Sequence, residues 1–322
     1  MTRKYGPIQV EVECVDQMVK AGHTRVADRW GDILDMPITE EELHTVVHRT
    51  TGNKSPGHDG ICMEFFKNNW STIKDDMLVM FNQMYSTGSI KEQQKHGIVI
   101  CIPKTTTPKT PAHYRPITLL NTDYKILARI VANRLRPIIA EILHPSQHGG
   151  RQGGGIFDAL ATVRDAIAYA EMTNTPLCVL SLDFTEAFDR ISHIYLFKLL
   201  AEYGFSTKFI SFIKNIYDKA YSSIDINGHT TGPIPILCGV RQGCPLSMLL
   251  FAMCLNPLLW LLDQTLTGIR IGKATRTAVV AYADDITLLI TDPEDIPALT
   301  DTLSRTYLRV SSGLDFHQTI PS

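Results

Sequence analysis

Two adjacent carboxylates, Asp284 and Asp285, lie between two apolar, β-prone runs, 278–282 and 286–290. Two such runs around a short polar stretch predict a β-hairpin with its charges at the turn. Neighbouring carboxylates repel each other, and burial beside a sheet adds a desolvation cost. A divalent cation would relieve both penalties. For an isolated pair, a solvated turn is the alternative interpretation.

A third acid, Asp183, ends another β-prone run, 177–183. Carboxylates at the ends of separate strands can converge when those strands are neighbours in a sheet. Converging carboxylates at Asp183, Asp284 and Asp285 could hold two divalent ions, which stabilise the attacking and leaving oxygens of a phosphoryl transfer. The spacing by itself leaves that convergence open.

Two cations, Lys104 and Arg115, flank a loop rich in Thr, Pro and Lys. The segments on either side, 97–104 and 114–121, have strand character, so a hairpin would bring the two cations together at its loop end. Arg offers a bidentate fork and Lys a point charge, a combination suited to a triphosphate. Two solvated surface cations are the alternative.

The elements that must position these residues mix helices and strands, which predicts an α/β (α+β) fold. Thr39 and Glu42 have capping-box spacing and predict the start of a helix. Residues 221–226 and 234–237 predict a hairpin with Asn227-Gly228 in its turn region. Residues 1–36 show no strong period and are expected to be a leader or linker. Apolar patterns predict further helices at 123–143, 156–170, 192–202, 206–217, 246–262 and 296–310.

Composition limits the class of protein. With 322 residues, 44% of them hydrophobic, the chain can bury a sizeable core. Its net charge of −2 does not indicate a polyanionic partner. Its seven cysteines are scattered without CxxC pairs, as in a reduced intracellular protein. The N-terminus lacks the apolar segment of a signal peptide. The most apolar run, 246–262, contains Asn256 and Pro257, so we expect a buried core helix, bent near Pro257, rather than a membrane span.

Charge is distributed unevenly along the chain. Between Lys91 and Arg136 there are nine Lys or Arg residues and two acids, whereas residues 284–301 contain six acids and neither Lys nor Arg. A basic segment and an acidic centre suit a protein that holds a polyanion and a metal together. Segregation of this size also occurs by chance on protein surfaces.

Five motifs occur in an order that is specific in combination. They are Lys54-Ser55-Pro56-Gly57-His58-Asp59-Gly60-Ile61; Tyr114-Arg115-Pro116-Ile117; Leu182-Asp183-Phe184 with Ala187-Phe188-Asp189; Arg241-Gln242-Gly243-Cys244-Pro245-Leu246-Ser247; and Tyr282-Ala283-Asp284-Asp285. From about residue 37 to its end, the chain resembles the reverse transcriptase domain of non-LTR (long interspersed element-type) retrotransposons. RNA-dependent RNA polymerases are disfavoured because they prefer Gly-Asp-Asp, where this chain has Ala283-Asp284-Asp285.

The resemblance implies a right-hand polymerase fold with an antiparallel palm sheet and packed helices. The fingers would occupy residues 37–175, together with the start of the palm, and the palm would occupy 176–322. We expect no endonuclease before this domain and no thumb after it, which would make the chain a truncated element product.

The resemblance also implies roles for single residues. Asp183 and Asp284 would be the principal ligands of two Mg²⁺ ions, with Mn²⁺ as a substitute, and Asp285 would lie beside them. Phe188 falls where the family has an aromatic steric gate against the ribose 2′-hydroxyl; a core Phe is the alternative. Lys104 and Arg115 would hold the triphosphate. The other motif residues are Gln242 and Gly243, which would line the nucleotide and template pocket, and Arg241, Pro245, Tyr282 and Ala283.

The implied activity is RNA-directed DNA polymerisation in retrotransposition. The 3′-hydroxyl of a DNA primer on an RNA template would attack the α-phosphorus of a dNTP. The alternative is a catalytically weak or inactive remnant that only binds nucleic acid, because the tail after Leu314 lacks the family's Lys and has only His317 as a poor substitute. We expect an intracellular location, in the nucleus or cytoplasm, without membrane contact.

Overall fold

The computed structural model describes residues 12–21, 25–151, 153–184, 186–272, 276–304 and 314–317. The chain divides into two compact units that alternate along the sequence. The first comprises Met1–Pro7, Ala27–Leu135 and Phe205–Ser247, and the second comprises Ile8–Val26, Arg136–Gly204 and Met248–Ser322. Each unit mixes helices and strands, as the sequence predicts. The predicted boundaries at 36 and 175 stay a prediction.

The first unit contains a mixed sheet of β1 (Gly97–Pro103), β2 (Tyr114–Leu120), β4 (Tyr221–Ile226), β5 (His229–Thr230) and β6 (Ile234–Pro235). Its order is β2-β1-β4-β5, and β6 also pairs with β4. Strand β1 runs antiparallel to β2 and parallel to β4. Both hairpins predicted for this unit are confirmed. Asn227 and Gly228 have φ of +53° and +80°, which suits the tight turn between β4 and β5.

Helix α3 (Glu40–Arg49) begins at the capping box that the sequence predicts. In the predicted capping box, Thr39 Oγ1 accepts from Glu42 N at 3.2 Å and Thr39 N donates to Glu42 Oε2 at 2.9 Å. The helices are α2 (Asp28–Asp35), α3 (Glu40–Arg49), α4 (Met63–Asn68), α5 (Trp70–Thr87), α6 (Glu92–Lys95), the 3₁₀ turn η1 (Pro111–His113), α7 (Thr122–Ile142) and α10 (Thr207–Tyr217). The division between the units falls inside α7.

A buried ion pair ties α7 to α3. The Arg134 side chain is 7% exposed, and its Nε and Nη2 donate to the Glu42 carboxylate at 2.6 and 2.7 Å. Nη1 also donates to Met36 O and Nη2 to Pro37 O. Burial would raise the pKa of Glu42, but the bonds from Arg134 and Thr39 outweigh burial and lower that pKa below its ordinary value.

The second unit contains an antiparallel sheet of β3 (Cys178–Phe184), β9 (Val279–Tyr282), β10 (Asp285–Ile290) and β11 (Leu314–His317), in the order β11-β3-β10-β9. A two-stranded ribbon joins β7 (Ile269–Arg270) to β8 (Arg276–Thr277). The helices of this unit are α1 (Val12–Ala21), α8 (Ile156–Thr173), the 3₁₀ turn η2 (Ala187–Arg190), α9 (His193–Glu202), α11 (Ser247–Thr265) and α12 (Asp295–Thr302). Residues 305–310 of the last predicted helix lie outside the described residues.

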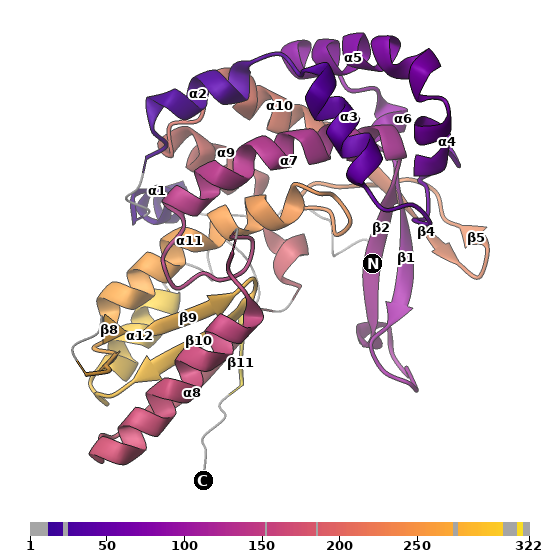
Figure 1. Cartoon of the computed structure of the whole chain (residues 1–322). Coiled ribbons are helices and arrows are strands. Elements are labelled where there is room, and N and C mark those ends of the chain that lie inside the picture. The colour runs from indigo at the N-terminus through magenta and orange to yellow at the C-terminus, as the bar shows by residue number, and fades with distance from the viewer. Residues whose placement is uncertain are drawn as a thin grey trace. The chain divides into compact units, whose positions relative to one another are not determined.

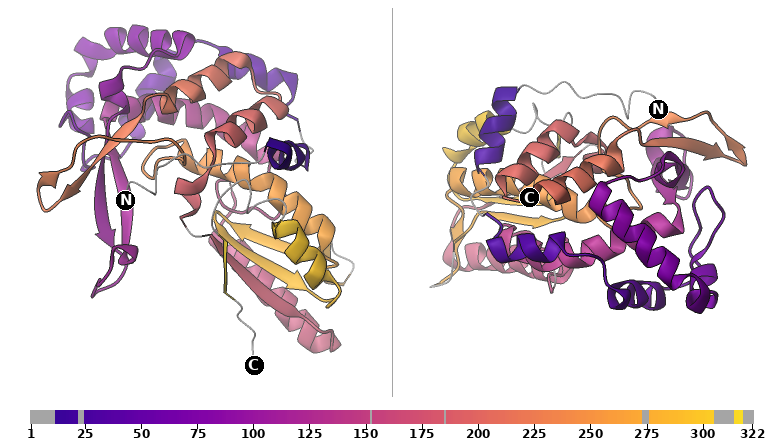
Figure 2. Two further views of the ribbon diagram at one scale, coloured as in Figure 1. Left: turned by 180° about the vertical axis from the view of Figure 1, so that it is seen from behind. Right: turned by 90° about the horizontal axis from the view of Figure 1, so that it is seen from above.

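Helix α8 covers one face of the sheet in the second unit (Figure 1). Its Ala159, Ala166 and Ala170 pack against Val280 of β9 and Leu289 of β10. Small side chains let the helix approach the strands closely. Helix α12 lies on the opposite face of this sheet (Figure 2). The strands are therefore covered on both sides, which favours apolar residues along both of their faces.

Two helices occupy the segment predicted as a leader or linker, 1–36. Val15 and Met18 of α1 are fully buried, and α1 packs on α9 within the second unit. Leu34 of α2 is fully buried in the first unit, where Tyr85 Oη donates to its carbonyl at 2.6 Å. No periodicity in the sequence pointed to either helix.

One helix among the described residues, α11, is long and apolar enough to cross a membrane, but 67% of its apolar window is buried inside the protein. Asn256 within it is fully buried and bonded. This burial matches the core helix that the sequence predicts.

Replacing Arg134 tests the buried ion pair. We expect Arg134→Met to lower the free energy of unfolding by about 3 kcal/mol, because Glu42 and three backbone carbonyls would lose their donor. Arg164 is the matched control, since its side chain is 76% exposed although it pairs with Asp165 at 2.7 Å. Arg164→Met should change stability by about 0.5 kcal/mol or less. Equal decreases in the free energy of unfolding for Arg134→Met and Arg164→Met, measured by urea denaturation, would contradict this account.

Candidate active site

The two adjacent carboxylates lie at a tight turn between β9 and β10. Tyr282 and Asp285 form the last pair of this ladder, so Ala283 and Asp284 make the turn. Ala283 is buried and has φ of +56°, in the left-handed region, which costs an L-residue about 1–2 kcal/mol. The predicted hairpin is confirmed. Its turn is held in a conformation that Ala does not favour on its own.

Asp183 lies on the strand next to this hairpin. Strands β3 and β10 pair antiparallel with Leu182 opposite Ile286, so the same register places Asp183 across from Asp285. Leu182 and Ile286 are fully buried, whereas Asp183 and Asp285 are exposed. Because alternate residues face opposite sides of a strand, the register places Asp183 and Asp285 on the same side of the sheet, opposite to Leu182 and Ile286. The structure therefore brings Asp183, Asp284 and Asp285 to one end of the two central strands.

The chemistry of these donors fits a divalent cation. Carboxylate oxygens suit Mg²⁺, which proteins bind through one or two carboxylates while water and substrate phosphates complete its shell. Among the described residues, no group of three or more His, Cys, Asp or Glu side chains lies where it could hold a metal ion. The exposed pair Asp183 and Asp285 fits a site of this open kind.

Phe188 lies in η2, shortly after β3. Its ring stacks on Phe251 of α11, with centroids 4.6 Å apart and planes at 22°. Phe251 is 1% exposed, whereas Phe188 is only half-buried. The stack fixes the ring of Phe188 from one side and leaves part of it accessible. This placement accommodates both a gate and a core Phe, so the gate stays a prediction.

In the first unit, the predicted hairpin carries Lys104 and Arg115 at its loop end. Arg115 pairs with Ile102, and Lys104 N donates to His113 O at 2.8 Å, which continues the ladder. Lys104 follows Ile102 by two positions, so alternation places Lys104 and Arg115 on the same face. Both side chains are exposed. The hairpin itself is confirmed, and triphosphate binding stays a prediction.

The loop that carries the Arg-Gln-Gly motif is anchored by its first residue. Arg241 is buried, its Nη1 donates to Lys95 O at 2.6 Å, and the ring of Tyr124 lies 5.0 Å from its guanidinium. Ser247 Oγ donates to Arg241 O at 2.7 Å and closes the loop. Among the described residues, Nε and Nη2 of Arg241 have no hydrogen-bond partner. Pro245 is half-buried just before α11.

The tip of this loop lies on β2. Thr118 N donates to Gln242 O at 2.7 Å. Gly243 has φ of +120°, and a Cβ at that position would lie 2.2 Å from Thr118 O. Only Gly fits this close approach. The backbone of Gln242 and Gly243 is thus held by β2, within the same unit as Lys104 and Arg115.

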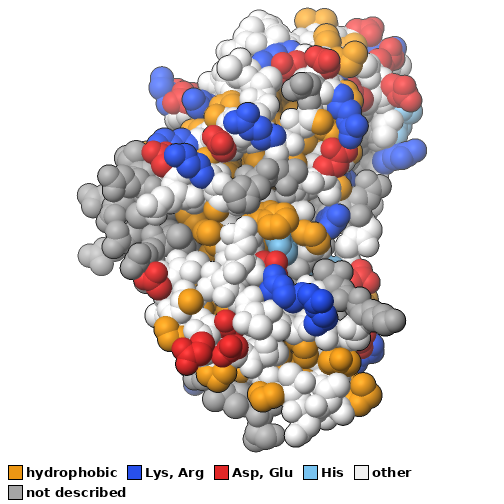
Figure 3. All heavy atoms as spheres, turned by 90° about the vertical axis from the view of Figure 1, so that its left-hand side faces the viewer, with side chains coloured by type: hydrophobic (Ala, Val, Ile, Leu, Met, Phe, Trp, Pro, Cys, Tyr) orange, Lys and Arg blue, Asp and Glu red, His pale blue; other side chains and the backbone are white. Residues whose placement is uncertain are grey.

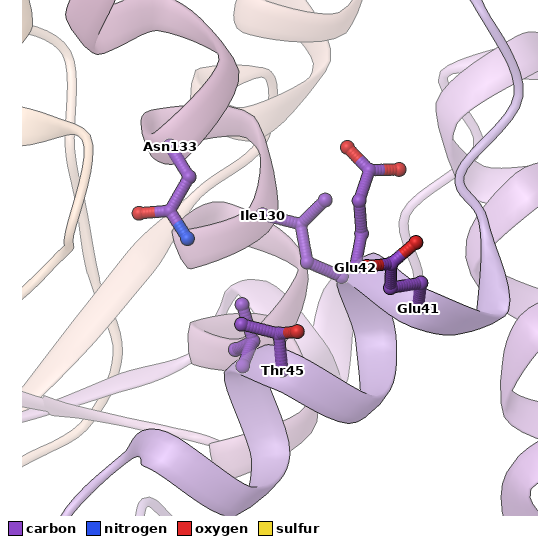
Figure 4. A pocket seen from close by; sticks show the side chains of 6 residues that line it. Glu41, Glu42, Thr45, Ile130 and Asn133 are labelled. Atoms are coloured by element: carbon purple, nitrogen blue, oxygen red, sulfur yellow. The ribbon is translucent and has the colours of Figure 1, made fainter.

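A pocket elsewhere in the first unit contains none of the predicted site residues. It has a volume of about 170 Å³ and lies between α3 and α7, with Glu41, Thr45, Ile130 and Asn133 in its lining (Figure 4). Its other acid, Glu42, already pairs with Arg134. Ion pairing and a mixed lining explain this pocket without a substrate.

The face seen in Figure 3 carries charges of both signs. Lys and Arg side chains are interspersed there with Asp and Glu, with small hydrophobic patches between them. A mixed surface of this kind suits a chain whose net charge is −2. The candidate site therefore depends on local placement of charge rather than on a global potential.

Gln147 contacts the carboxylate turn, a contact that its place in the sequence does not predict. It is fully buried, and its side-chain amide bonds to both the N–H and the C=O of Ala283. In the sequence, Gln147 opens a Gly-rich stretch, 147–155, which is typical of a flexible loop. Nothing local to that stretch indicates which backbone the amide contacts.

The chain belongs to the reverse transcriptase (RNA-dependent DNA polymerase) family, whose profile matches residues 102–318. This confirms the resemblance found in the motifs. Its relatives are non-LTR retrotransposon proteins, and the match covers their reverse transcriptase region. Members of this family generally use divalent metal ions.

Three relatives illustrate the match. The chain is 36% identical over 272 residues to the Transposon TX1 uncharacterized 149 kDa protein of Xenopus laevis, covering 84% of this chain and 21% of that protein. It is 30% identical over 265 residues to the Retrovirus-related Pol polyprotein from type-2 retrotransposable element R2DM of Drosophila melanogaster, covering 82% and 24%. It is 30% identical over 226 residues to the Probable RNA-directed DNA polymerase from transposon X-element of the same species, covering 68% and 25%. The chain thus spans about a quarter or less of the length of each.

Gly243 and Gly232 provide a matched test of the loop geometry, since both lie in the first unit. We expect Gly243→Ala to destabilise the protein by about 2 kcal/mol or more, because its Cβ would overlap the backbone of Thr118. Gly232 has nothing within 4 Å of an added Cβ, so Gly232→Ala should be neutral or slightly stabilising. Thermal unfolding of both variants measures the difference. Tolerance of Ala at 243 would refute the close approach.

Proposed function

We propose that this chain is the catalytic part of an RNA-directed DNA polymerase of a non-LTR retrotransposon. The single observation that carries the proposal is the register that sets Asp183 and the Asp284-Asp285 turn at one end of β3 and β10. In a right-hand polymerase the first unit would form most of the fingers and the second the palm. The β1–β2 hairpin, which carries Lys104 and Arg115, and the Arg-Gln-Gly loop both belong to the first unit.

Each residue has a defined part in the proposed chemistry. Asp183 and Asp284, with Asp285 beside them, would hold two Mg²⁺ ions, which supply charge neutralisation for the transferred phosphoryl group. Lys104 and Arg115 would bind the triphosphate oxygens. The bond from the primer 3′-oxygen to the α-phosphorus forms, the bond to the leaving pyrophosphate breaks, and the hydroxyl proton is lost to solvent.

The substrates follow from the family. An RNA template, a DNA primer and dNTPs are the general substrates of an RNA-directed DNA polymerase. The Probable RNA-directed DNA polymerase from transposon X-element supports the same assignment by its similarity. A remnant that only binds nucleic acid is not favoured, because all three predicted carboxylates are present at the end of adjacent strands.

Loss of a carboxylate tests the polymerase directly. We expect Asp284→Asn to reduce primer extension on an RNA template by about 100-fold or more, because the site would lose charge that binds metal. Asp165→Asn is the matched control, since Asp165 is a 55% exposed acid of the same unit. That control should extend primers at the parent rate. An Asp284→Asn variant with parent activity would exclude this site.

Phe188 is tested by nucleotide choice. We expect Phe188→Val to narrow the preference for dNTPs over rNTPs by about 10-fold or more, because a smaller side chain no longer clashes with the 2′-hydroxyl. Phe157 is the control, being an 82% exposed Phe of the same unit, and Phe157→Val should leave the preference unchanged. The ratio of kcat/KM for matched dNTP and rNTP is the measurement. An unchanged ratio for Phe188→Val would indicate that Phe188 is a core residue and not a steric gate.

A further inference from the structure

The segment before α8 adds to the edge of the catalytic sheet. Ala281 N donates to Ser146 O at 2.9 Å, and His148 N donates to Ala281 O at 2.8 Å. These bonds form a parallel bridge between Gln147 and Ala281 of β9. The backbone around Gln147 therefore runs alongside the strand that leads into the carboxylate turn.

The side chain of Gln147 reaches past β9 to the turn itself. Its Oε1 accepts from Ala283 N at 3.0 Å and from Gly149 N at 2.8 Å, and its Nε2 donates to Ala283 O at 3.2 Å. One amide thus satisfies both backbone groups of Ala283. Since Ala283 has φ of +56°, these bonds favour a conformation that Ala seldom adopts.

The segment is held at its other end by the core helix. Asn256 of α11 is fully buried; its Oδ1 accepts from His144 N at 2.6 Å and its Nδ2 donates to Ile142 O at 3.0 Å. Close packing continues up to the turn, because a Cβ on Gly149 would lie 2.3 Å from Ala283 N. Gln147 is therefore fixed between α11 and the turn.

We infer that Gln147 is a positioning residue for Asp284. Holding both backbone groups of Ala283 fixes the peptide that joins Ala283 to Asp284, and with it the direction in which that carboxylate leaves the turn. This inference rests on the proposed polymerase function, in which Asp284 would be a metal ligand. Glutamine suits the task because it offers a donor and an acceptor at once, without charge beside three carboxylates.

The first experiment measures amide exchange in the full chain, which needs no activity. Gln147→Met keeps length and removes all three bonds, so the Ala283 amide should exchange about 10-fold faster than in the parent. Asp295→Ala is the matched control, because Asp295 accepts from Thr267 N at 2.7 Å and Thr267 Oγ1 at 3.1 Å within the same unit. It should speed exchange at Thr267 and leave Ala283 unchanged.

The second experiment separates positioning from stability. In primer extension on RNA, Gln147→Met should raise the half-saturating Mg²⁺ concentration by about 10-fold and lower kcat. Asp295→Ala should leave the Mg²⁺ midpoint at the parent value even where it lowers the Tm. Equal midpoints for parent and Gln147→Met, with equal exchange at Ala283, would overturn the inference.

A second variant covers the case in which Gln147→Met does not fold. Gln147→Glu keeps an acceptor for Ala283 N and loses the donor to Ala283 O, so the Ala283 amide should exchange faster than in the parent. The parent exchange rate at Ala283 in this variant would overturn the inference. Inactive parent protein would refute the proposed function alone, because amide exchange at Ala283 still decides whether Gln147 holds the turn.

Discussion

Negative charges gathered at one end of a sheet must be held against their own repulsion, and the ladder between β3 and β10 supplies that constraint. Leu182 and Ile286 pair across it and are fully buried. A slip of one residue would exchange the faces of these residues and move Asp183 and Asp285 into the positions that bury Leu182 and Ile286, which raises the free energy of the folded state. Burial of apolar side chains therefore sets the positions of the acids.

The turn that joins β9 to β10 depends on a different kind of support. Its left-handed Ala283 is opposed by local sterics, so the conformation must be stabilised by groups outside the hairpin. Gln147 supplies hydrogen bonds and Asn256 anchors the segment that carries it. When every buried polar group of a network has a hydrogen-bond partner, the network favours a single arrangement of its side chains. A site with several carboxylates requires such a fixed arrangement.

Two buried arginines of the first unit offset the desolvation cost of their charge in different ways. Arg134 has a carboxylate, Glu42, and three backbone carbonyls, so its charge is compensated directly. Among the described residues, Arg241 has one carbonyl partner, Lys95 O, and an aromatic face, Tyr124, and it organises a loop whose backbone must approach β2 closely. The first arrangement joins helices, whereas the second shapes the Arg-Gln-Gly loop.

Short-range patterns were enough to predict the hairpins, the capping box at Thr39 and most helices, because alternation, capping and turn chemistry act within a few residues. They did not reveal α1 and α2, whose burial depends on partners distant in the chain. The sequence by itself determined the family and the candidate acids. Only the tertiary structure decided that β3 lies beside β10 and that Gln147 contacts Ala283, 136 positions away, because pairing between remote segments is selected by packing and backbone hydrogen bonding that no local period encodes.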